Sequence, residues 1–519
     1  MGSSIRSFHS LKAFRAVFPA VTFSAVAFAG GCGGVIGPLP SVPPPPSLQS
    51  LTAADVAALV QAAAQAADPN TMVIAVADRA GNVLAVYRMP SAPALATGNF
   101  GAQVDTNELA VSLARTGAFF SNDQAPLSSR TVRFLSGIHF PPGIANTPNA
   151  ALYGIENTNR GCTLSTNFIA GQTVPPARSI GGAGPGLGIT TGKADLSDSD
   201  PNAVNPGGVP LFRNGSVVGG IGIAGVAPDI AEFAAYTAAT SNGFGPSPAP
   251  PGVVFINGVA LPFVNQTTRP AGVGAGSFTG SFVVGPSASP GPPPEGLLVA
   301  PADGLLGGLS ASEVTQIINN SIATANITRA VIRLPIGSST RMAIAVADLD
   351  GTIIGLYRMA DSTVFSIDVA ATKARNMVYF SSAARTAADL NGVPMGTAVT
   401  NRTIGFGAQP FFPPGIDGSA AGPFFNLYQQ DVANPCTQGF QVAGPNQSGI
   451  VFFPGSVPLY RNGVLVGGLG ISGDGVDQDD FVAAGGSVGF EAPAAIRADQ
   501  VTLRGVRLPY LKFPQNPTN

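Results

Sequence analysis

The chain contains one stretch of sequence twice. The residues MVIAVADRAGNVLAVYRM at 72–89 return as MAIAVADLDGTIIGLYRM at 342–359, and the likeness extends far to both sides. Two copies of one sequence fold as two related units, because each copy carries the same pattern of residues that must be buried. A chain of 519 residues is also too long for a single hydrophobic core. We therefore predict two related domains, at 50–266 and 306–513.

Each copy opens with the signs of a helix and a strand hairpin. LTAADVAALVQAAAQAA at 51–67 matches LSASEVTQIINNSIATA at 309–325, where Ser310 and Glu313 have the spacing of a helix capping box. Aliphatic and β-branched residues on both sides of a turn then predict the two strands of a hairpin. In that turn, Gly81 of the first copy supplies the positive φ that a tight hairpin needs.

A second helix and a second hairpin follow in each copy. Apolar residues recur at helical spacing over 105–121 and 366–382, with a polar stripe beside them. In the second copy this polar stripe consists of Asp368, Thr372, Arg375 and Tyr379. Further along, the Asn-Gly pairs at 214–215 and 462–463 stand between apolar stretches and predict type I′ hairpins. Each copy is therefore expected to combine helices with antiparallel strands.

The segment between the copies has a different composition. Residues 267–305 are rich in Gly, Pro and Ser, which predicts a linker with little structure of its own. At the end of the chain, residues 514–519 are predicted to form a loose tail.

Two cysteines occupy corresponding places in the two copies. Cys162 and Cys436 can form one disulfide between the halves, or they can remain two free buried thiols, and the sequence leaves both alternatives open. Neither cysteine lies in a C-x-x-C pattern, which argues against a zinc site.

The first residues have the features of an export signal. Basic residues precede the apolar stretch AVFPAVTFSAVAF, which is too short to span a membrane, and small residues then lead to Cys32. The junction FAGGC resembles the lipobox of bacterial lipoproteins. This likeness implies a signal peptide at 1–31, a lipid on Cys32, a Pro-rich tether at 32–49, and a place in the cell envelope, either periplasmic or on the outer surface. An ordinary secretory signal is the alternative, and both interpretations predict export.

The charge balance limits the choice of partners. The formal net charge is −2, only 10% of the residues are charged, and no long run of Lys or Arg is present. A protein that binds a phosphate backbone needs a basic surface. Nucleic acid is therefore not expected as a partner.

The order of these motifs resembles the HbpS-like, or GlcG-like, family of haem-binding and haem-degrading domains. The likeness rests on the hairpin that ends in YRM, on the helix with DVAATKA at 368–374, and on the hairpin VPLYRNGVLVGGLGISG at 457–473. It covers most of each copy. The resemblance implies an α+β fold of two tandem profilin-like α/β/α domains, each with an antiparallel sheet flanked by helices. Because relatives form oligomers, the tandem copies are expected to form a covalent pseudo-dimer that self-associates.

For function, the resemblance implies haem or another small ligand. Haem needs an apolar slot, an axial donor and cations near its propionates. The positions of the second copy that match the family are Asp348, Arg358, Asp368 and Lys373. Further candidate donors are Tyr357, Met359, Tyr379 and His139, and Arg375 is a further cation. In the first copy Leu113 replaces the lysine, so ligand binding is expected in the second copy.

Each of these residues also has a simpler interpretation. An isolated histidine such as His139 is most often an ordinary hydrogen-bonded residue, and Met and aromatic residues at such spacings usually belong to a core. Lys373 and Arg375 can be helix-face residues that point into solvent or toward Asp368. The sequence leaves these alternatives open.

No catalytic constellation emerges, which favours a binding protein over an enzyme. After the signal segment His139 is the only histidine, and no triad partners are recognised around it. We predict an exported, lipid-anchored protein that binds haem or another small ligand. The alternatives are a non-catalytic assembly protein that retains only the oligomerisation surface, and a haem-degrading enzyme.

Overall fold

The structure, a computed structural model, describes residues 50–98, 101–162, 180, 187, 206–246 and 254–518. The predicted signal peptide and tether, with Cys32, lie outside these residues. Within the described part of the chain, no helix has both the length and the apolar character needed to cross a bilayer.

The first repeat contains the helices and strands that its motifs predict, together with short elements that the sequence did not indicate. Its helices are α1 (Ala53–Ala66), α2 (Thr106–Phe120), α3 (Ser129–Ser136) and α4 (Pro228–Ser241), and a 3-10 turn covers Ile155–Asn157. Its strands are β1 (Val73–Asp78), β2 (Val83–Arg88), β3 (Leu95–Thr97), β4 (Gln103–Asp105), β5 (Gly208–Arg213), β6 (Ser216–Ala224), β7 (Phe255–Ile256), β8 (Val259–Ala260) and β9 (Ser281–Val284).

The second repeat follows the same order. Its helices are α5 (Ala311–Ile327), α6 (Ser366–Phe380), α7 (Asn401–Gly407), α8 (Phe425–Ala433) and α9 (Val476–Gly486), with 3-10 turns at Ala494–Ile496 and Ala498–Gln500. Its strands are β10 (Gly296–Val299), β11 (Ala343–Ala347), β12 (Ile353–Arg358), β13 (Ser456–Arg461), β14 (Val464–Ser472), β15 (Thr502–Leu503) and β16 (Val506–Arg507).

Local sequence signals account for most of the element boundaries. The Ser310 hydroxyl accepts a hydrogen bond from the Glu313 amide (3.3 Å), and the Glu313 carboxylate accepts one from the Ser310 amide (2.8 Å), which completes the predicted capping box of α5. Asn214 and Asn462 both have positive φ angles (51°), as the type I′ hairpins require. These predictions are confirmed.

The two sheets have the same strand order. The first sheet runs β5-β6-β1-β2-β9 and the second runs β13-β14-β11-β12-β10, with every neighbouring pair antiparallel. The registers also correspond, because Val73 pairs with Arg88 in the first repeat and Ala343 pairs with Arg358 in the second. This confirms the predicted α+β fold, in which each repeat contains an antiparallel sheet of the same strand order.

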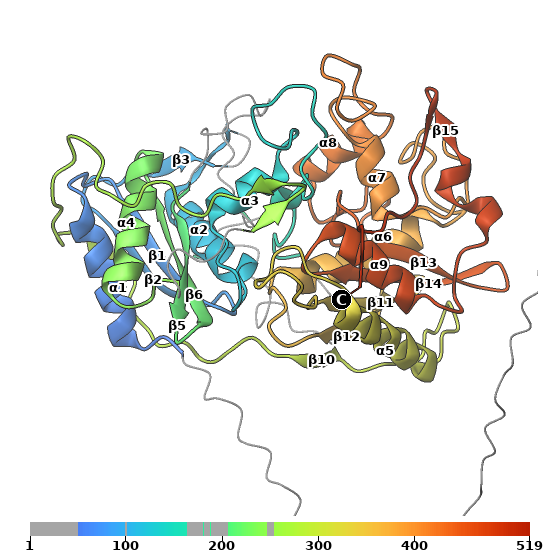
Figure 1. Ribbon diagram of the computed structural model, residues 1–519, viewed down its shortest axis with the longest axis horizontal. Coiled ribbons are helices and arrows are strands. Elements are labelled where there is room, and N and C mark those ends of the chain that lie inside the picture. Colours follow the sequence, from blue (N-terminus) through green and yellow to red (C-terminus); the bar gives the residue numbers. More distant parts are fainter. Residues whose placement is uncertain are drawn as a thin grey trace, which may run out of the picture. The chain divides into compact units, whose positions relative to one another are not determined.

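Helices cover both faces of each sheet. In the first repeat α1 and α4 pack together on one face and α2 packs on the other, and in the second repeat α5 and α9 take one face and α6 the other (Figure 1). Glycines in β6 allow α2 to approach closely. A Cβ atom on Gly220 would lie only 2.1 Å from the Ala114 carbonyl oxygen. The glycines of β6 therefore serve the contact between this strand and α2.

The segment expected to be a linker contributes a strand to each sheet. β9 pairs with β2, and β10 pairs with β12, so residues 267–305 supply the fifth strand of both sheets. The expectation of little structure is wrong here, because the open edges of β2 and β12 offer unpaired backbone groups to any short apolar stretch nearby. The predicted loose tail is also partly fixed, since the Arg329 amide donates to the Pro517 carbonyl oxygen (2.9 Å).

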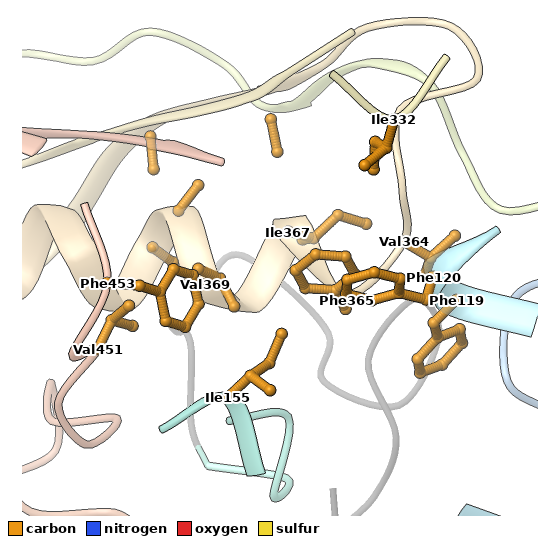
Figure 2. Close-up of a cluster of buried hydrophobic side chains, with 14 of the residues drawn as sticks. Phe119, Phe120, Ile155, Ile332, Val364, Phe365, Ile367, Val369, Val451 and Phe453 are labelled. Atoms are coloured by element: carbon orange, nitrogen blue, oxygen red, sulfur yellow. The ribbon is translucent and has the colours of Figure 1, made fainter. Parts of the chain in front are cut away.

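Two hydrophobic clusters contain residues of both repeats. Each sheet has its own core beneath its helices, but a further cluster combines the end of α2 with the start of α6. In this shared cluster the rings of Phe120 and Phe365 stack with their centroids 4.7 Å apart (Figure 2). The Val364 amide donates to the Phe119 carbonyl oxygen across the boundary (3.1 Å). The halves are thus packed against each other and not merely tethered.

Ion pairs close the same boundary. Arg79, in the turn between β1 and β2, contacts the carboxylates of Asp123 (3.0 Å) and Asp361 (2.7 Å). Asp361 also pairs with Arg333 (2.6 Å), and Arg333 contacts Asp474. Because each aspartate has an arginine partner, these charges are compensated within the boundary.

Candidate functional site

Helix α6 carries several of the predicted ligand residues. Every residue from Ser366 to Phe380 is buried, because the sheet covers one side of the helix and the segment 438–453 covers the other. The interpretation that Lys373 and Arg375 point into solvent is therefore wrong. The covering segment belongs to the long Gly/Pro/Asn-rich loop, whose path over the helix no local sequence pattern reveals.

Lys373 lies in a buried ion pair. Its Nζ atom donates to the Ile471 carbonyl oxygen (2.7 Å) and to the Asp479 carboxylate (3.0 Å), and it lies 5.0 Å from the centre of the Phe453 ring. Burial lowers the pKa of Lys373 and raises the pKa of Asp479 to about 7. When the two repeats are aligned, Leu113 stands in the place of Lys373 and Ala231 in the place of Asp479. The first repeat therefore replaces both partners of the pair with apolar residues.

Arg375 and Arg358 make hydrogen bonds that the first repeat also makes. The Arg375 Nε atom donates to the Gly351 carbonyl oxygen (2.9 Å), as Arg115 does to Gly81 (2.8 Å). Arg358 donates to the Ser362 carbonyl oxygen (3.1 Å), and Arg88 donates to the carbonyl oxygen of Ala92, the corresponding residue (2.7 Å). Burial lowers the pKa of both Arg358 and Arg375 to about 10. The same bond in both halves indicates a role in holding turns of the fold.

Asp348 and Met359 are also occupied by the fold. The Asp348 carboxylate accepts hydrogen bonds from the amides of Leu306 (2.9 Å) and Gly307 (2.7 Å), which hold the chain just before α5. The Met359 sulfur accepts from the Met342 amide (3.4 Å) inside the core of the second repeat. Both residues are therefore engaged in the fold, and for Met359 this is the core packing that the sequence left open as an alternative.

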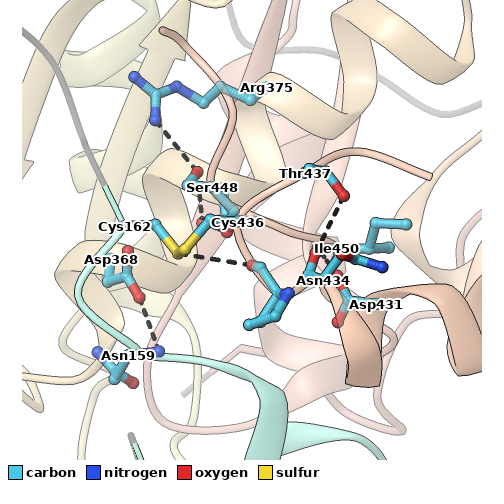
Figure 3. The surroundings of a disulfide bond; sticks show 12 residues. Asn159, Cys162, Asp368, Arg375, Asp431, Asn434, Cys436, Thr437, Ser448 and Ile450 are labelled. Atoms are coloured by element: carbon cyan, nitrogen blue, oxygen red, sulfur yellow. Dashed lines mark hydrogen bonds between the residues drawn. A yellow bond between two sulfur atoms is a disulfide. The ribbon is translucent and has the colours of Figure 1, made fainter. Parts of the chain in front are cut away.

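Asp368 lies at the boundary of the repeats, beside a disulfide that joins Cys162 to Cys436 (Figure 3). One carboxylate oxygen of Asp368 accepts from the Asn159 amide (2.8 Å), while the other has no hydrogen-bond partner among the described residues. Burial raises the pKa of Asp368 to about 6. Of the two alternatives for the cysteines, the structure contains the disulfide.

Asp431, on α8, is a buried acid that sequence reasoning missed. It lies close to the same disulfide (Figure 3), and its carboxylate accepts from the Ile450 amide (2.8 Å). Burial raises its pKa well above the usual range. No repeat or spacing marks this residue, because it lies in a stretch of the loop where the second copy has no evident match in the first.

His139 lies between the repeats and away from the cavities described below. Its Nε2 atom is 2.8 Å from an Asp417 carboxylate oxygen, and its ring centroid is 6.4 Å from that of Phe411, the corresponding residue of the second repeat. His139 is only 7% exposed. The contact with Asp417 engages one of the two ring nitrogens through which a histidine can bind a metal.

Tyr379 lines a cavity of about 440 Å³ at the C-terminal end of α6. Its hydroxyl donates to the Asp389 carboxylate (2.5 Å). Burial raises the pKa of the phenol, and the hydrogen bond to Asp389 raises it further. The apolar part of the wall consists of Leu349, Val378, Ala384, Phe440 and Val442. The loop residues of this wall were not singled out from the sequence.

Tyr357 lines a separate cavity of about 370 Å³ between α5 and β12. The described residues of its lining carry no charge and are Leu297, Pro301, Ala311, Ser312, Thr315, Ile318, Asn319, Ile322 and Tyr357. A third and larger cavity, of about 670 Å³, lies in the first repeat between the β3-β4 hairpin and the start of α4. The described residues that line it include no ionisable side chain.

The cavities meet the needs of haem only in part. The Tyr379 and Tyr357 cavities offer apolar walls and a phenol oxygen, which is one of the known axial donors. None of the described lining residues of the three cavities is a Lys, Arg, His, Cys or Met. A haem in either tyrosine cavity would therefore have to direct its propionates into solvent.

Comparison with known protein families finds a match within the second repeat. Residues 318–487 match the model of a family described as haem degrading protein HbpS-like. The second repeat is an HbpS-like domain. The match runs from the middle of α5 to the end of α9, so it includes α6 and the Tyr379 cavity. The first repeat shares the strand order and registers of this HbpS-like domain.

Solved structures that are similar to part of the chain include the following two. One is the crystal structure of a PduOC:haem complex, with 24% identity and a TM-score of 0.23, over 36% of this chain and 96% of that one. The other is Klebsiella pneumoniae protein ORFY, with 19% identity and a TM-score of 0.22, over 34% and 88% of the two chains. None of the curated proteins compared with the chain matches it.

Proposed function

We propose that the second repeat binds haem, or another flat small ligand, in the cavity beside Tyr379. The observation that carries this proposal is the phenol of Tyr379, which stands beside the apolar side chains of the cavity wall. Tyr379 presents a phenol hydrogen-bonded to Asp389, whereas the corresponding residue of the first repeat is Phe119. The family description, which names haem, applies to the repeat that has the tyrosine. A cavity of about 440 Å³ lies within the size range of small-molecule sites.

In this proposal each part of the cavity has a separate task. The apolar side chains of Val378 and Phe440 pack against the faces of the ligand, and Tyr379 fixes its orientation from the side of α6. Haem, when bound, would supply an iron that accepts an oxygen donor. Asp389 accepts a hydrogen bond from the phenol and so holds it in place. The polar side chains of Gln438 and Gln447 can contact the edge of the ligand.

We also propose that the chain is exported and anchored by a lipid on Cys32. The disulfide between Cys162 and Cys436 supports export, because such bonds persist in oxidising compartments. We further propose that the tandem copies act as a covalent pseudo-dimer. Contacts between corresponding residues, namely the disulfide and the contact of His139 with Phe411, support this arrangement.

A non-catalytic assembly protein is the second candidate function. It is favoured by the finding that Asp348, Arg358, Lys373 and Arg375 are all engaged within the fold. If these residues serve only the fold, the duplicated domain needs no ligand.

Haemin titration of the mature protein, followed by Soret absorbance, separates the two candidates. We expect a saturable spectral change with one haemin per chain, and at least a tenfold weaker affinity for Tyr379→Phe. Tyr357→Phe is the matched control and should bind as the wild type does. No saturable change in the wild type would remove haem and favour the assembly function. Analysis of the pigment after incubation with a reductant and oxygen tests haem breakdown, for which intact haem is the negative result.

A further inference from the structure

One tyrosine has different surroundings in the two repeats. Tyr87 of β2 is 1% exposed, because the ring of Phe278 stacks on it with centroids 4.7 Å apart and the ring of Phe282 meets its edge at 5.0 Å. The Gly280 amide donates to the Tyr87 hydroxyl (2.5 Å). Tyr357 is the corresponding residue of β12, and it lines the 370 Å³ cavity instead.

The path of the chain explains why Phe278 reaches Tyr87. Before β9 the chain runs along the end of α1, where the Gly276 amide donates to the Gln65 carbonyl oxygen (3.0 Å). The approach is so close that a Cβ atom on Gly276 would lie 2.2 Å from the Ala64 carbonyl oxygen. This contact holds Phe278 over the tyrosine ring, beside α1.

The second repeat has a residue that corresponds to Phe282, but none of its described residues corresponds to Phe278. Leu297 pairs with Tyr357 in the sheet, as Phe282 pairs with Tyr87. The chain before Leu297 turns toward Arg358, whose Nη1 atom donates to the Pro294 carbonyl oxygen (3.2 Å). No described residue takes the place of Phe278, and the cavity between Tyr357, Ile318 and α5 remains.

The lining of this cavity defines the chemistry of a ligand. Its walls are aliphatic and aromatic, and its polar groups are hydroxyls and one amide, from Ser312, Thr315 and Asn319. An uncharged lining disfavours a charged ligand, because nothing offsets the cost of removing the charge from water. An aromatic ring gains from stacking on a tyrosine in addition to its buried area.

We propose that this cavity binds a neutral aromatic molecule stacked on Tyr357, in the place that Phe278 fills in the first repeat. The site is distinct from the Tyr379 cavity and does not depend on haem. Its volume of about 370 Å³ is at the lower end of the range for small-molecule sites, which limits the ligand to a few fused or linked rings.

The test uses the full mature chain and the neutral fluorophore N-phenyl-1-naphthylamine. The protein contains no tryptophan, so the emission of the bound probe can be followed without that background. We expect one saturable site in the wild type and three- to tenfold weaker binding in Tyr357→Leu, which keeps an apolar side chain but removes the stacking face. No saturable binding, or unchanged affinity in Tyr357→Leu, would overturn the proposal.

A variant of the first repeat provides the sharper arm. Phe278 is 41% exposed, so Phe278→Ala should fold, and it should open the corresponding place over Tyr87. The number of probe molecules bound should then rise from one to two. A stoichiometry that stays at one would contradict the equivalence on which the proposal rests. Tyr379→Phe should leave probe binding unchanged, and a loss in that variant would place the probe in the other cavity and overturn the assignment.

Discussion

The two repeats solve one packing problem in two ways. At the middle of α6, the second repeat buries Lys373 against Asp479, while the first repeat has Leu113 and Ala231 at the corresponding positions. Both solutions leave the strand order and register unchanged. The fold thus accepts either two opposite charges or two apolar residues at these positions. A single buried charge without its partner would cost stability.

The largest expected effect comes from breaking that match. Lys373→Leu removes one partner and leaves the Asp479 carboxylate buried without a cation, so we expect a loss of about 3–5 kcal/mol in the free energy of unfolding. Chemical denaturation measures it. Lys373→Leu combined with Asp479→Ala copies the first repeat and should recover most of the loss. If the double variant were no more stable than the single one, the idea of a matched pair would fail.

The disulfide links the repeats, and its removal should have the next largest effect. Cys162→Ser with Cys436→Ser is expected to lower the free energy of unfolding by about 2–4 kcal/mol, because the bridge restricts the unfolded chain. Denaturation curves of the variant and of the wild type with a reductant should coincide. A reductant that has no effect on the wild type would indicate that the cysteines are not bridged.

The ion pairs at the boundary contribute less. Arg79→Leu introduces the residue that the second repeat has at the corresponding position, Leu349, and removes the contacts to Asp123 and Asp361. We expect a loss of about 1–3 kcal/mol, because hydrogen bonds to charged groups are broken. Arg213→Leu, which breaks a more exposed pair with Asp55, is the matched control and should cost less than about 1 kcal/mol. Equal losses would argue against a structural role of the boundary.

The last expected effect concerns pH. The pKa of Asp368 is about 6 in the folded protein, above its usual value of 3.8, so the folded state holds this proton more tightly than the unfolded state. The stabilisation is therefore complete below pH 3.8 and is lost as the pH rises to about 6. Asp368→Asn removes this dependence. Its stability relative to the wild type should rise between about pH 4 and about pH 7 in urea denaturation, and a parallel pH profile would contradict the assignment.

Sequence reasoning succeeded where the cause of structure is local. The capping box at Ser310 and Glu313 and the Asn-Gly hairpins depend on residues within a few positions of one another, and their predictions were correct. The α+β class followed from the same local signals together with the family resemblance. Because the two halves have corresponding motifs, each prediction made for one half could also be made for the other.

It failed where a residue depends on distant chain segments. The partner of Lys373 is Asp479, which lies 106 positions further along the chain in the first turn of another helix. The compensating Ala231 could not be recognised without knowing that contact. β9 and β10 were hidden in a Gly/Pro-rich segment, because a short apolar stretch becomes a strand only when a sheet edge is available. The Tyr379 cavity likewise depends on the path of a long loop.

The edge strands β9 and β10 come at different points in the synthesis of their sheets. β9 follows every other strand of its sheet along the chain, whereas β10 precedes every other strand of its own. As the chain emerges in order from its N-terminus, the first sheet therefore exposes the edge of β2 until Val284 has emerged, while the second sheet carries its edge strand from the beginning. Chaperone contact with the emerging chain should concentrate on the first domain, in the interval before that last strand arrives.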